Sequence, residues 1–264
     1  MRAFKKPVTL GLVVGSRLFF NGAPALAARE QAVAQLEKLG IAVKTLAADA
    51  TDNGAVQSRK DAALYGDFFR SHRDDIDGLV FLLPNFGDEV AVAECVSRAA
   101  LNVPILLQAS NDEVDKVDVQ HRRDAFCGKI SVTNNFYQYG IRFTDTSLHT
   151  LDVDGEVFGG DLARFAAVCR TVRGLKNARI GAIGARTPPF HTMRYSEKLL
   201  QASGITVVTV DLSEIIAAAS TTLSEADSDV KAKLDEIFAY GSIPKTIKRE
   251  NIAKQACFSI AVDR

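Results

Sequence analysis

The sequence predicts an α/β fold in which a doubly wound parallel sheet is followed by a second, incomplete α/β domain. Short Val/Ile/Leu-rich runs with few polar interruptions alternate with stretches of helical length. Such runs are typical of strands buried on both faces, and their alternation with helices is typical of right-handed βαβ units. We therefore expect a flavodoxin- or Rossmann-like domain at residues 1–175 and the start of a second α/β domain at 176–264.

In the first domain, capping and turn residues indicate where several helices begin and end. Asn21 can cap a helix whose first turn holds Pro24, and Gly40 can end that helix. Ser131 can cap a later helix that Gly140 ends. The expected strands are 8–14, 41–46, 78–83, 104–108 and 146–152, and the expected helices are 25–39, 55–72, 88–100, 131–139 and 158–175.

The region after residue 175 repeats the alternation with fewer strands. Two strands are too few to close a sheet core, so we expect this domain to be incomplete. Residues at helical spacing continue up to Arg264, and no Gly or Pro ends the helix. This pattern favours the interpretation that the sequence is a truncated piece of a longer one. The expected strands are 178–183 and 205–210, and the expected helices are 195–202, 212–219, 224–239 and 249–262.

Charge and composition argue against several classes of protein. Lys+Arg and Asp+Glu both number 32, so the chain lacks the basic excess with which nucleic-acid-binding proteins neutralise phosphates. No apolar stretch reaches the roughly 18 residues of a membrane span. The four cysteines form no CxxC pair, which favours reduced thiols in a cytoplasmic protein over a zinc ribbon or a disulfide framework. We therefore expect neither nucleic acid nor a membrane as partner.

The first 30 residues imitate a secretory signal. Arg2, Lys5 and Lys6 precede an apolar run, and residues 25–27 resemble a cleavage site. Arg17, however, interrupts the stretch that should be apolar, and the run itself is short and rich in Val. These features favour a buried first strand over a signal peptide.

The chain carries no familiar motif for catalysis or nucleotide binding. Residues 11–15 lack the third glycine of GxGxxG, and no P-loop, GxSxG or HExxH occurs. None of the four histidines has a second histidine within five residues, as paired metal ligands often do. The acidic run 112–121 lacks the Gly and terminal Glu of an EF-hand, so a solvated loop is favoured over a cation site.

Polar and aromatic side chains follow the expected strands at the edge where parallel sheets bind ligands. Loops 15–21, 84–89 and 108–113 combine basic, amide and acidic groups with aromatic rings. A polyol site needs this mixture, because hydroxyls require donors and acceptors and C–H surfaces pack on flat rings. Asp88 more simply caps the following helix. Arg17 is either an ion-pair partner or a fixed donor fork for substrate oxygens, and both interpretations stay open.

Four segments carry a resemblance when taken in order. They are VVGSR at 13–17, LPNFGDE at 83–89, LLQASN at 106–111 and RTPPFHTMRYSE at 186–197. Together they resemble the L-fucose/L-arabinose isomerase superfamily, particularly its fucose-isomerase-like branch. The resemblance runs from about residue 8 to the end and covers the N-terminal domain and part of the central domain. The role of the last segment stays open.

The resemblance implies an aldose–ketose isomerase of carbohydrate metabolism. Members of that superfamily use a divalent cation, usually Mn²⁺, and form trimers or hexamers with the active site between subunits. A proton moves between C1 and C2 through a cis-enediol(ate), with the metal polarising the oxygens and a carboxylate carrying the proton. The metal ligands follow the region that this chain resembles. We therefore expect a Mn²⁺-dependent homo-oligomer at full length, and no bound metal and no activity for this chain alone.

The resemblance also assigns substrate contacts, but no catalytic residue and no metal ligand. Polar positions after the first and fourth strands would fix distal hydroxyls of the sugar, and aromatic positions would exclude water. Two amides at a helix start would border the site. The expected substrate-binding residues are the polar Arg17 and Gln108, the aromatic Phe19 and Phe86, and the amides Asn134 and Asn135.

Two other functions stay open at this point. The signal-like N-terminus and two α/β lobes would also suit a non-catalytic sugar-binding module of the periplasmic-binding-protein type, after removal of residues 1–27. A phosphate or nucleotide site at loop 15–21 ranks last, because no phosphate fingerprint is present. The identity of the sugar also stays open among fucose, arabinose and a modified or sulfonated hexose.

Overall fold

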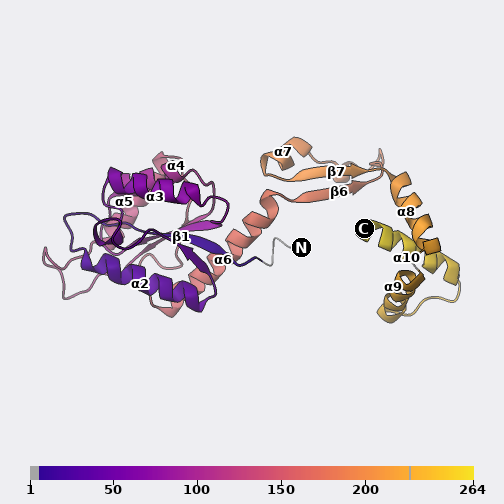
Figure 1. The fold of residues 1–264 in the computed structure, drawn as a ribbon, viewed down its shortest axis with the longest axis horizontal. Coiled ribbons are helices and arrows are strands. Elements are labelled where there is room, and N and C mark those ends of the chain that lie inside the picture. The colour runs from indigo at the N-terminus through magenta and orange to yellow at the C-terminus, as the bar shows by residue number, and fades with distance from the viewer. Residues whose placement is uncertain (1–5, 226) are drawn as a thin grey trace. The chain divides into compact units, whose positions relative to one another are not determined.

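The computed structural model describes residues 6–225 and 227–264. Its chain divides into two compact units, one ending at Gly174 and the other spanning Leu175–Arg264. The first unit contains a five-stranded, wholly parallel sheet with strand order β2-β1-β3-β4-β5 (Figure 1). This is the predicted doubly wound α/β architecture. The strands are β1 (Thr9–Val14), β2 (Ala42–Lys44), β3 (Gly78–Leu83), β4 (Ile105–Ala109) and β5 (Thr144–Asp145).

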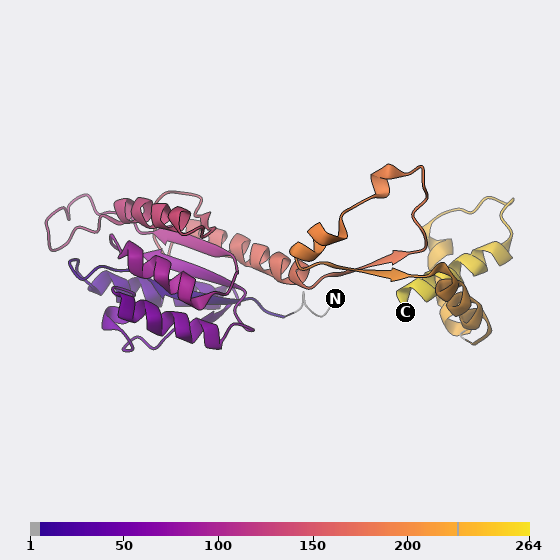
Figure 2. The same ribbon diagram turned by 90° about the horizontal axis from the view of Figure 1, so that it is seen from above.

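Helices cover both faces of this sheet. Helices α2 and α6 pack on one face and α3, α4 and α5 on the other, and Figure 2 looks down on the second group. No helix in the described ranges combines the length and the apolar character needed to cross a membrane. The bounds are α2 (Ala23–Lys38), α3 (Arg59–Ser71), α4 (Glu89–Ala99), α5 (Ala125–Gln138) and α6 (Glu156–Lys176), with a 3-10 turn η1 at Asp52–Gly54.

Strand β1 lies inside the sheet and is buried along its whole length. Because side chains alternate along a strand, Leu10 and Leu12 enter the apolar cluster under α2 and α6, whereas Val13 joins the cluster under α3, α4 and α5. On the latter side the Phe81 ring meets the edge of Phe136 at 6.0 Å between centroids. Removal of residues 1–27 would therefore delete a central strand, which weighs against the binding-module alternative.

Most predicted elements of the first unit are confirmed with small shifts of their ends, but two predictions are wrong. The helix expected at 131–139 begins at Ala125, after Asp124 in a left-handed conformation that provides no side-chain cap. The strand expected at 146–152 is only Thr144–Asp145. Beyond it the chain leaves the sheet, and Leu151 returns to β4 through two hydrogen bonds. Its N–H donates to the Ala109 carbonyl (3.0 Å), and its carbonyl accepts from the Gln108 side chain (2.8 Å).

The second unit pairs two parallel strands and forms a separate small core from helices. The strand residues are exposed or half-buried, whereas Ala219, Leu234, Ala256 and Ile260 are buried among the helices. The expected shortage of strands is confirmed. The bounds are β6 (Arg179–Ile183), η2 (His191–Met193), α7 (Glu197–Ala202), β7 (Thr206–Val210), α8 (Leu212–Glu225), α9 (Asp227–Tyr240) and α10 (Arg249–Asp263).

The four cysteines differ sharply in accessibility, and all are free thiols. Cys95, Cys169 and Cys257 are buried, whereas Cys127 is exposed on α5. Burial raises the pKa of the Cys95 and Cys169 thiols to about 12, and the Asp77 carboxylate adds to the effect at Cys169. Because the thiolate is the reactive form, both buried groups should be inert near neutral pH.

We predict that iodoacetamide modifies Cys127 of the native protein at pH 8 while Cys95 and Cys169 stay unmodified. Peptide mass spectrometry after timed quenching measures each site, and full modification in urea supplies the upper limit. Cys127→Ser should abolish the fast phase. Rapid labelling of Cys95 in the folded protein would contradict the burial described above.

Candidate functional site

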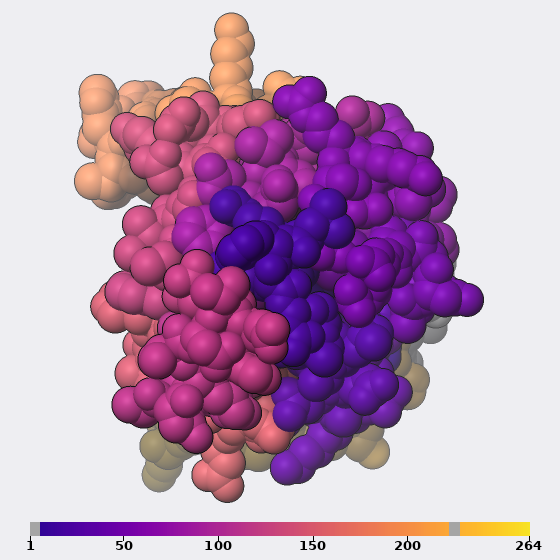
Figure 3. All heavy atoms as spheres, turned by 90° about the vertical axis from the view of Figure 1, so that its left-hand side faces the viewer, coloured from indigo at the N-terminus to yellow at the C-terminus, as the bar shows by residue number. Residues whose placement is uncertain are grey.

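The carboxyl ends of β1, β3 and β4 open onto one edge of the sheet, where three loops meet. Figure 3 faces this edge, and the indigo segment after β1 lies in its middle, between purple and pink segments that follow it in the sequence. The loops are 15–22, 84–88 and 110–124. Ligands of open parallel sheets bind at such edges.

A buried asparagine joins the first two loops. Asn85 is 1% exposed, and its side-chain nitrogen donates to Ser16 Oγ at 2.8 Å and to the Asn21 carbonyl at 3.4 Å. Its oxygen accepts the Gly87 N–H at 3.1 Å, and Gly87 adopts a φ of +75° that favours glycine. The Asp88 N–H donates to the Ser16 carbonyl at 3.0 Å. The two loops therefore form one hydrogen-bonded unit.

Arg17 projects from this unit with its guanidinium held on three sides. Nε donates to the Gly87 carbonyl at 2.9 Å, and Nη2 lies 3.5 Å from Glu89 Oε2. The guanidinium carbon lies 4.3 Å from the centre of the Phe86 ring, a cation–π contact. Nη1 has no hydrogen-bond partner among the described residues. The interpretation of Arg17 as an ion-pair partner is confirmed, whereas its role as a donor to substrate oxygens stays a prediction.

Glu89 links Arg17 to helix α5. It is the first residue of α4, after Asp88, whose side chain caps the helix by accepting the Ala91 N–H at 2.8 Å. Glu89 Oε2 also accepts the Ser131 hydroxyl from α5. The Glu89 carboxylate lies at the N-terminus of α4, where the helix dipole attracts negative charge.

Aromatic rings make an exposed apolar surface beside Arg17. Phe20 stacks on Phe86 at 6.3 Å between centroids, and Phe19 meets Phe20 edge-on at 5.6 Å. Phe19 is 63% exposed and its neighbour Leu18 is 71% exposed. The structure therefore brings Arg17, Phe19 and Phe86 together, with Phe20 as the link between the rings.

Gln108 lies in β4, away from solvent. It is fully buried, and its nitrogen donates to the Leu151 carbonyl at 2.8 Å and to Ser110 Oγ at 3.5 Å. Its oxygen has no partner within the described residues. These bonds hold the segment around Leu151 to the sheet edge, whereas a contact between Gln108 and sugar stays a prediction.

Asn134 and Asn135 lie near the end of α5, so the expectation that they sit at a helix start is wrong. Helix α5 already begins at Ala125, nine residues before Asn134. Asn134 is exposed and accepts from Gln138 at 2.6 Å, and Asn135 donates to the Ser131 carbonyl at 3.3 Å. Both hydrogen bonds stay within α5, and neither residue bonds to Arg17, Phe19 or Phe86.

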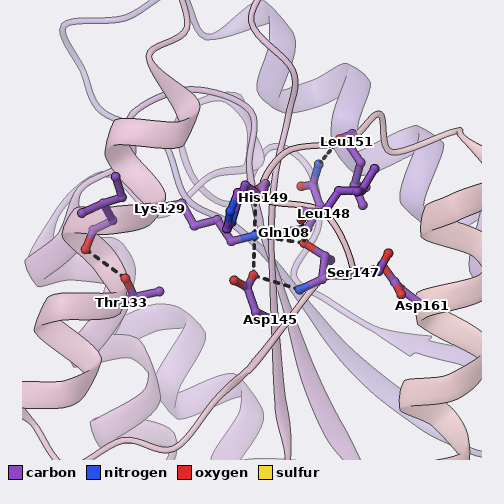
Figure 4. Close-up of polar contacts among 11 residues, drawn as sticks. Gln108, Lys129, Thr133, Asp145, Ser147, Leu148, His149, Leu151 and Asp161 are labelled. Atoms are coloured by element: carbon purple, nitrogen blue, oxygen red, sulfur yellow. Dashed lines mark hydrogen bonds and ion pairs between the residues drawn. The ribbon is translucent and has the colours of Figure 1, made fainter.

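A buried lysine fastens the loop after β5 (Figure 4). Lys129 on α5 is 3% exposed, and its ammonium donates to Thr146 Oγ1 at 2.9 Å and to the His149 carbonyl at 2.8 Å. It also forms an ion pair with Asp145. From the other side, Asp161 on α6 accepts the Ser147 N–H and hydroxyl, both at 2.9 Å. The loop is therefore held between two helices.

Sequence reasoning did not single out Ser16, Asn85, Lys129 or Glu89 as residues that build this edge, and it considered Ser131 only as a helix cap. An asparagine two positions before a glycine is a turn signal that could have pointed to Asn85. For Lys129 no local signal exists, because its partners are 16 to 20 residues further along the chain. A lone lysine in a helix is usually solvated.

Comparison with known proteins now identifies the family. Residues 11–176 match the family described as Fucose/sulfoquinovose isomerase, N-terminal domain. The chain belongs to the fucose/sulfoquinovose isomerase family. The match runs from β1 to α6, so all three loops of the edge lie within it. No curated protein matches the chain.

Isomerases of this family depend on a metal ion, but this N-terminal domain does not group its potential ligands as a metal site requires. Within residues 6–225 and 227–264, no three His, Cys, Asp or Glu side chains gather as metal ligands would. In loop 110–124, Glu113 instead forms ion pairs with Lys116 and with Arg123 (2.8 Å), and Asp124 pairs with Arg122 (3.3 Å). The described residues therefore do not fit a metal centre, and no step through a metal is assigned to them.

Helix α5 of this isomerase-family domain packs so closely on the loop that holds Phe86 that no side chain fits at the contact position, Gly128. A Cβ at Gly128 would overlap the backbone of Phe86, whereas a Cβ at Gly160 in α6 would meet nothing within 4 Å.

We predict that Gly128→Ala destabilises the protein by about 1–3 kcal/mol, since the helix must shift. Gly160→Ala should be neutral or stabilising by up to about 1 kcal/mol, because alanine favours helix. Thermal unfolding of both variants tests this, and equal melting temperatures would contradict the close approach.

The Lys129 contacts give a second prediction. Lys129→Met removes one ion pair and two hydrogen bonds and leaves the His149 carbonyl without its donor. Because the Asp145 side chain is 45% exposed, water can replace part of the loss, and we expect about 2 kcal/mol of destabilisation. Urea unfolding measures it, with exposed Lys60→Met as control within about 0.5 kcal/mol of the parent. An unchanged urea midpoint for Lys129→Met would show that the Lys129 contacts do not stabilise the folded protein.

Proposed function

We propose that this chain forms the sugar-orienting wall of an aldose–ketose isomerase, with the metal centre on residues outside these 264. The observation that supports this most directly is the Arg17 guanidinium, fixed by Gly87, Glu89 and Phe86 with Nη1 left for a ligand. When bound, the metal supplies polarisation of the sugar's carbonyl and hydroxyl oxygens. The residues described here bind and orient the distal part of the sugar.

Arg17 and the aromatic rings would divide this task. A guanidinium that is already held in place loses little side-chain entropy when it donates to a hydroxyl. Phe19 and Phe86 offer flat apolar surface to the C–H face of a sugar and displace water from it. Orientation of this kind contributes several kcal/mol, in order of magnitude, when the reacting groups are brought to near-attack geometry.

We further propose that the wall faces a neighbouring subunit in a homo-oligomer, a trimer or hexamer as the resemblance implies. The adjacent Leu18 and Phe19 are largely exposed, as side chains that complete a site on another surface would be. Gln108 would act indirectly in this arrangement, since its nitrogen fixes the Leu151 segment.

The test is performed on the natural gene product that contains this chain, assayed with Mn²⁺ and a panel of aldoses. We predict that Arg17→Lys lowers kcat/KM at least tenfold, because lysine keeps the charge but loses the fork that Gly87 and Glu89 orient. Arg59→Lys is the matched control, because Arg59 is an exposed arginine that also pairs with a glutamate, Glu94. Ketose formation is measured together with melting temperature, so that misfolding is recognised.

Three outcomes would overturn the proposal. They are absence of isomerisation for every aldose, full activity of Arg17→Lys, and Mn²⁺-dependent turnover by residues 1–264 alone. The last would contradict the placement of the metal centre outside this chain.

A further inference from the structure

The edge that carries Arg17 is acidic. Loops 15–22, 84–88 and 110–124, together with Glu89 at the start of α4, hold four Lys and Arg residues against seven Asp and Glu residues. A site built for an anionic ligand shows the opposite balance, because unpaired cations attract it and like charges repel it.

Every cation of this edge already has a carboxylate partner. The hydrogen bond from Lys116 lowers the pKa of Glu113, and the one from His121 lowers the pKa of Asp118, so both acids are ionised near neutral pH. Arg122 approaches the Phe20 ring at 6.0 Å but is itself paired. The pairs are Arg17 with Glu89 (3.5 Å), Arg122 with Asp124 (3.3 Å), Arg123 with Glu113 (2.8 Å), and Lys116 with Glu113.

Glu89 matters most, because it governs the charge that a ligand of Arg17 would meet. A ligand that accepts from Nη1 lies within a few ångströms of the Glu89 carboxylate, since Nη2 of the same guanidinium is 3.5 Å from Oε2. The Ser131 hydroxyl holds that carboxylate in place from α5. A neutral hydroxyl can use Nη1 without disturbing the pair, whereas an anion meets a fixed negative charge.

The family description spans two chemically different sugars. Fucose ends in a methyl group at C6, and sulfoquinovose ends in a sulfonate at C6. We propose that this chain belongs with the neutral class: the sugar end that meets Arg17 is uncharged, and Glu89 is the specificity-determining residue that rejects a 6-sulfonate. The inference rests on the proposed function. The exposed side chains of Leu18 and Phe19 suit a methyl group and give no donor to a sulfonate.

The experiment compares sugars that differ only at C6, using the natural gene product with Mn²⁺. Two matched pairs cover both configurations: 6-deoxy-D-glucose with its 6-sulfonate, and 6-deoxy-L-galactose with its 6-sulfonate. We expect kcat/KM for the neutral member of the converted pair to exceed that of the sulfonate at least tenfold. Glu89→Gln keeps the hydrogen bond from Ser131 but removes the charge, and should reduce that ratio at least threefold.

Glu94→Gln is the matched control, since Glu94 lies on the same helix and pairs with Arg59 and Arg98 instead. Its ratio should equal that of the parent, and the salt dependence of the ratio should weaken only in Glu89→Gln. Conversion of the sulfonate at equal or higher kcat/KM overturns the inference while the isomerase proposal stands. An unchanged ratio in Glu89→Gln overturns the role of Glu89. Absence of conversion of all four sugars overturns the inference together with a C6-deoxysugar isomerase function.

Discussion

The buried side chain of Asn85 is the constraint on which the sheet edge depends. Adjacent parallel strands end at the same edge, so the loops after β1 and β3 must leave the sheet side by side. Asn85 satisfies its own amide by binding Ser16, Asn21 and Gly87, and thereby fixes both loops against each other. A buried polar group left without partners costs about 1–3 kcal/mol, so this arrangement excludes alternatives in which the loops separate. The bond from the Gly87 N–H to Asn85 also positions Gly87, whose carbonyl accepts the hydrogen bond from Arg17 Nε.

Helix α5 locks the same edge from the side. Gly128 lets the helix approach the Phe86 backbone, and Ser131, one turn later, reaches Glu89. Lys129 points the other way and holds the loop after β5. Gly128, Lys129 and Ser131 thus fasten two different loops from within about one turn of α5, and a shift of the helix would disturb both. The stability of the helix and the geometry of Arg17 are coupled through this turn.

The parts of the fold that are predictable from sequence are those whose signal is local. Strand β3 was predicted with its observed ends, because the run GLVFLL lies between Asp77 and Pro84, and a short, wholly apolar run is typical of a strand buried on both faces. The start of α5 was missed because Asp124 is left-handed and the deciding contact, Gly128 against Phe86, is about 40 residues away in sequence. The resemblance assigned Gln108 to a substrate contact, and the structure shows that the Leu151 carbonyl accepts a hydrogen bond from its nitrogen, while a contact with sugar stays a prediction. Local pattern cannot distinguish a buried structural amide from a binding one.

The edge has the character of one wall of a site. Its polar groups are nearly all satisfied internally, which makes it rigid before a ligand arrives, while Phe19 and Leu18 remain in water. The exposure of these apolar side chains to water is unfavourable. Burial beneath another surface or a ligand, next to the fixed donor, would stabilise them. Rigidity from Asn85 and α5 therefore serves selection: a loop that could relax would let Arg17 leave Glu89 and accept an anion. Because Ser131 of α5 holds the Glu89 carboxylate at the start of α4, the proposed choice between a neutral and a charged sugar depends on how these two helices pack.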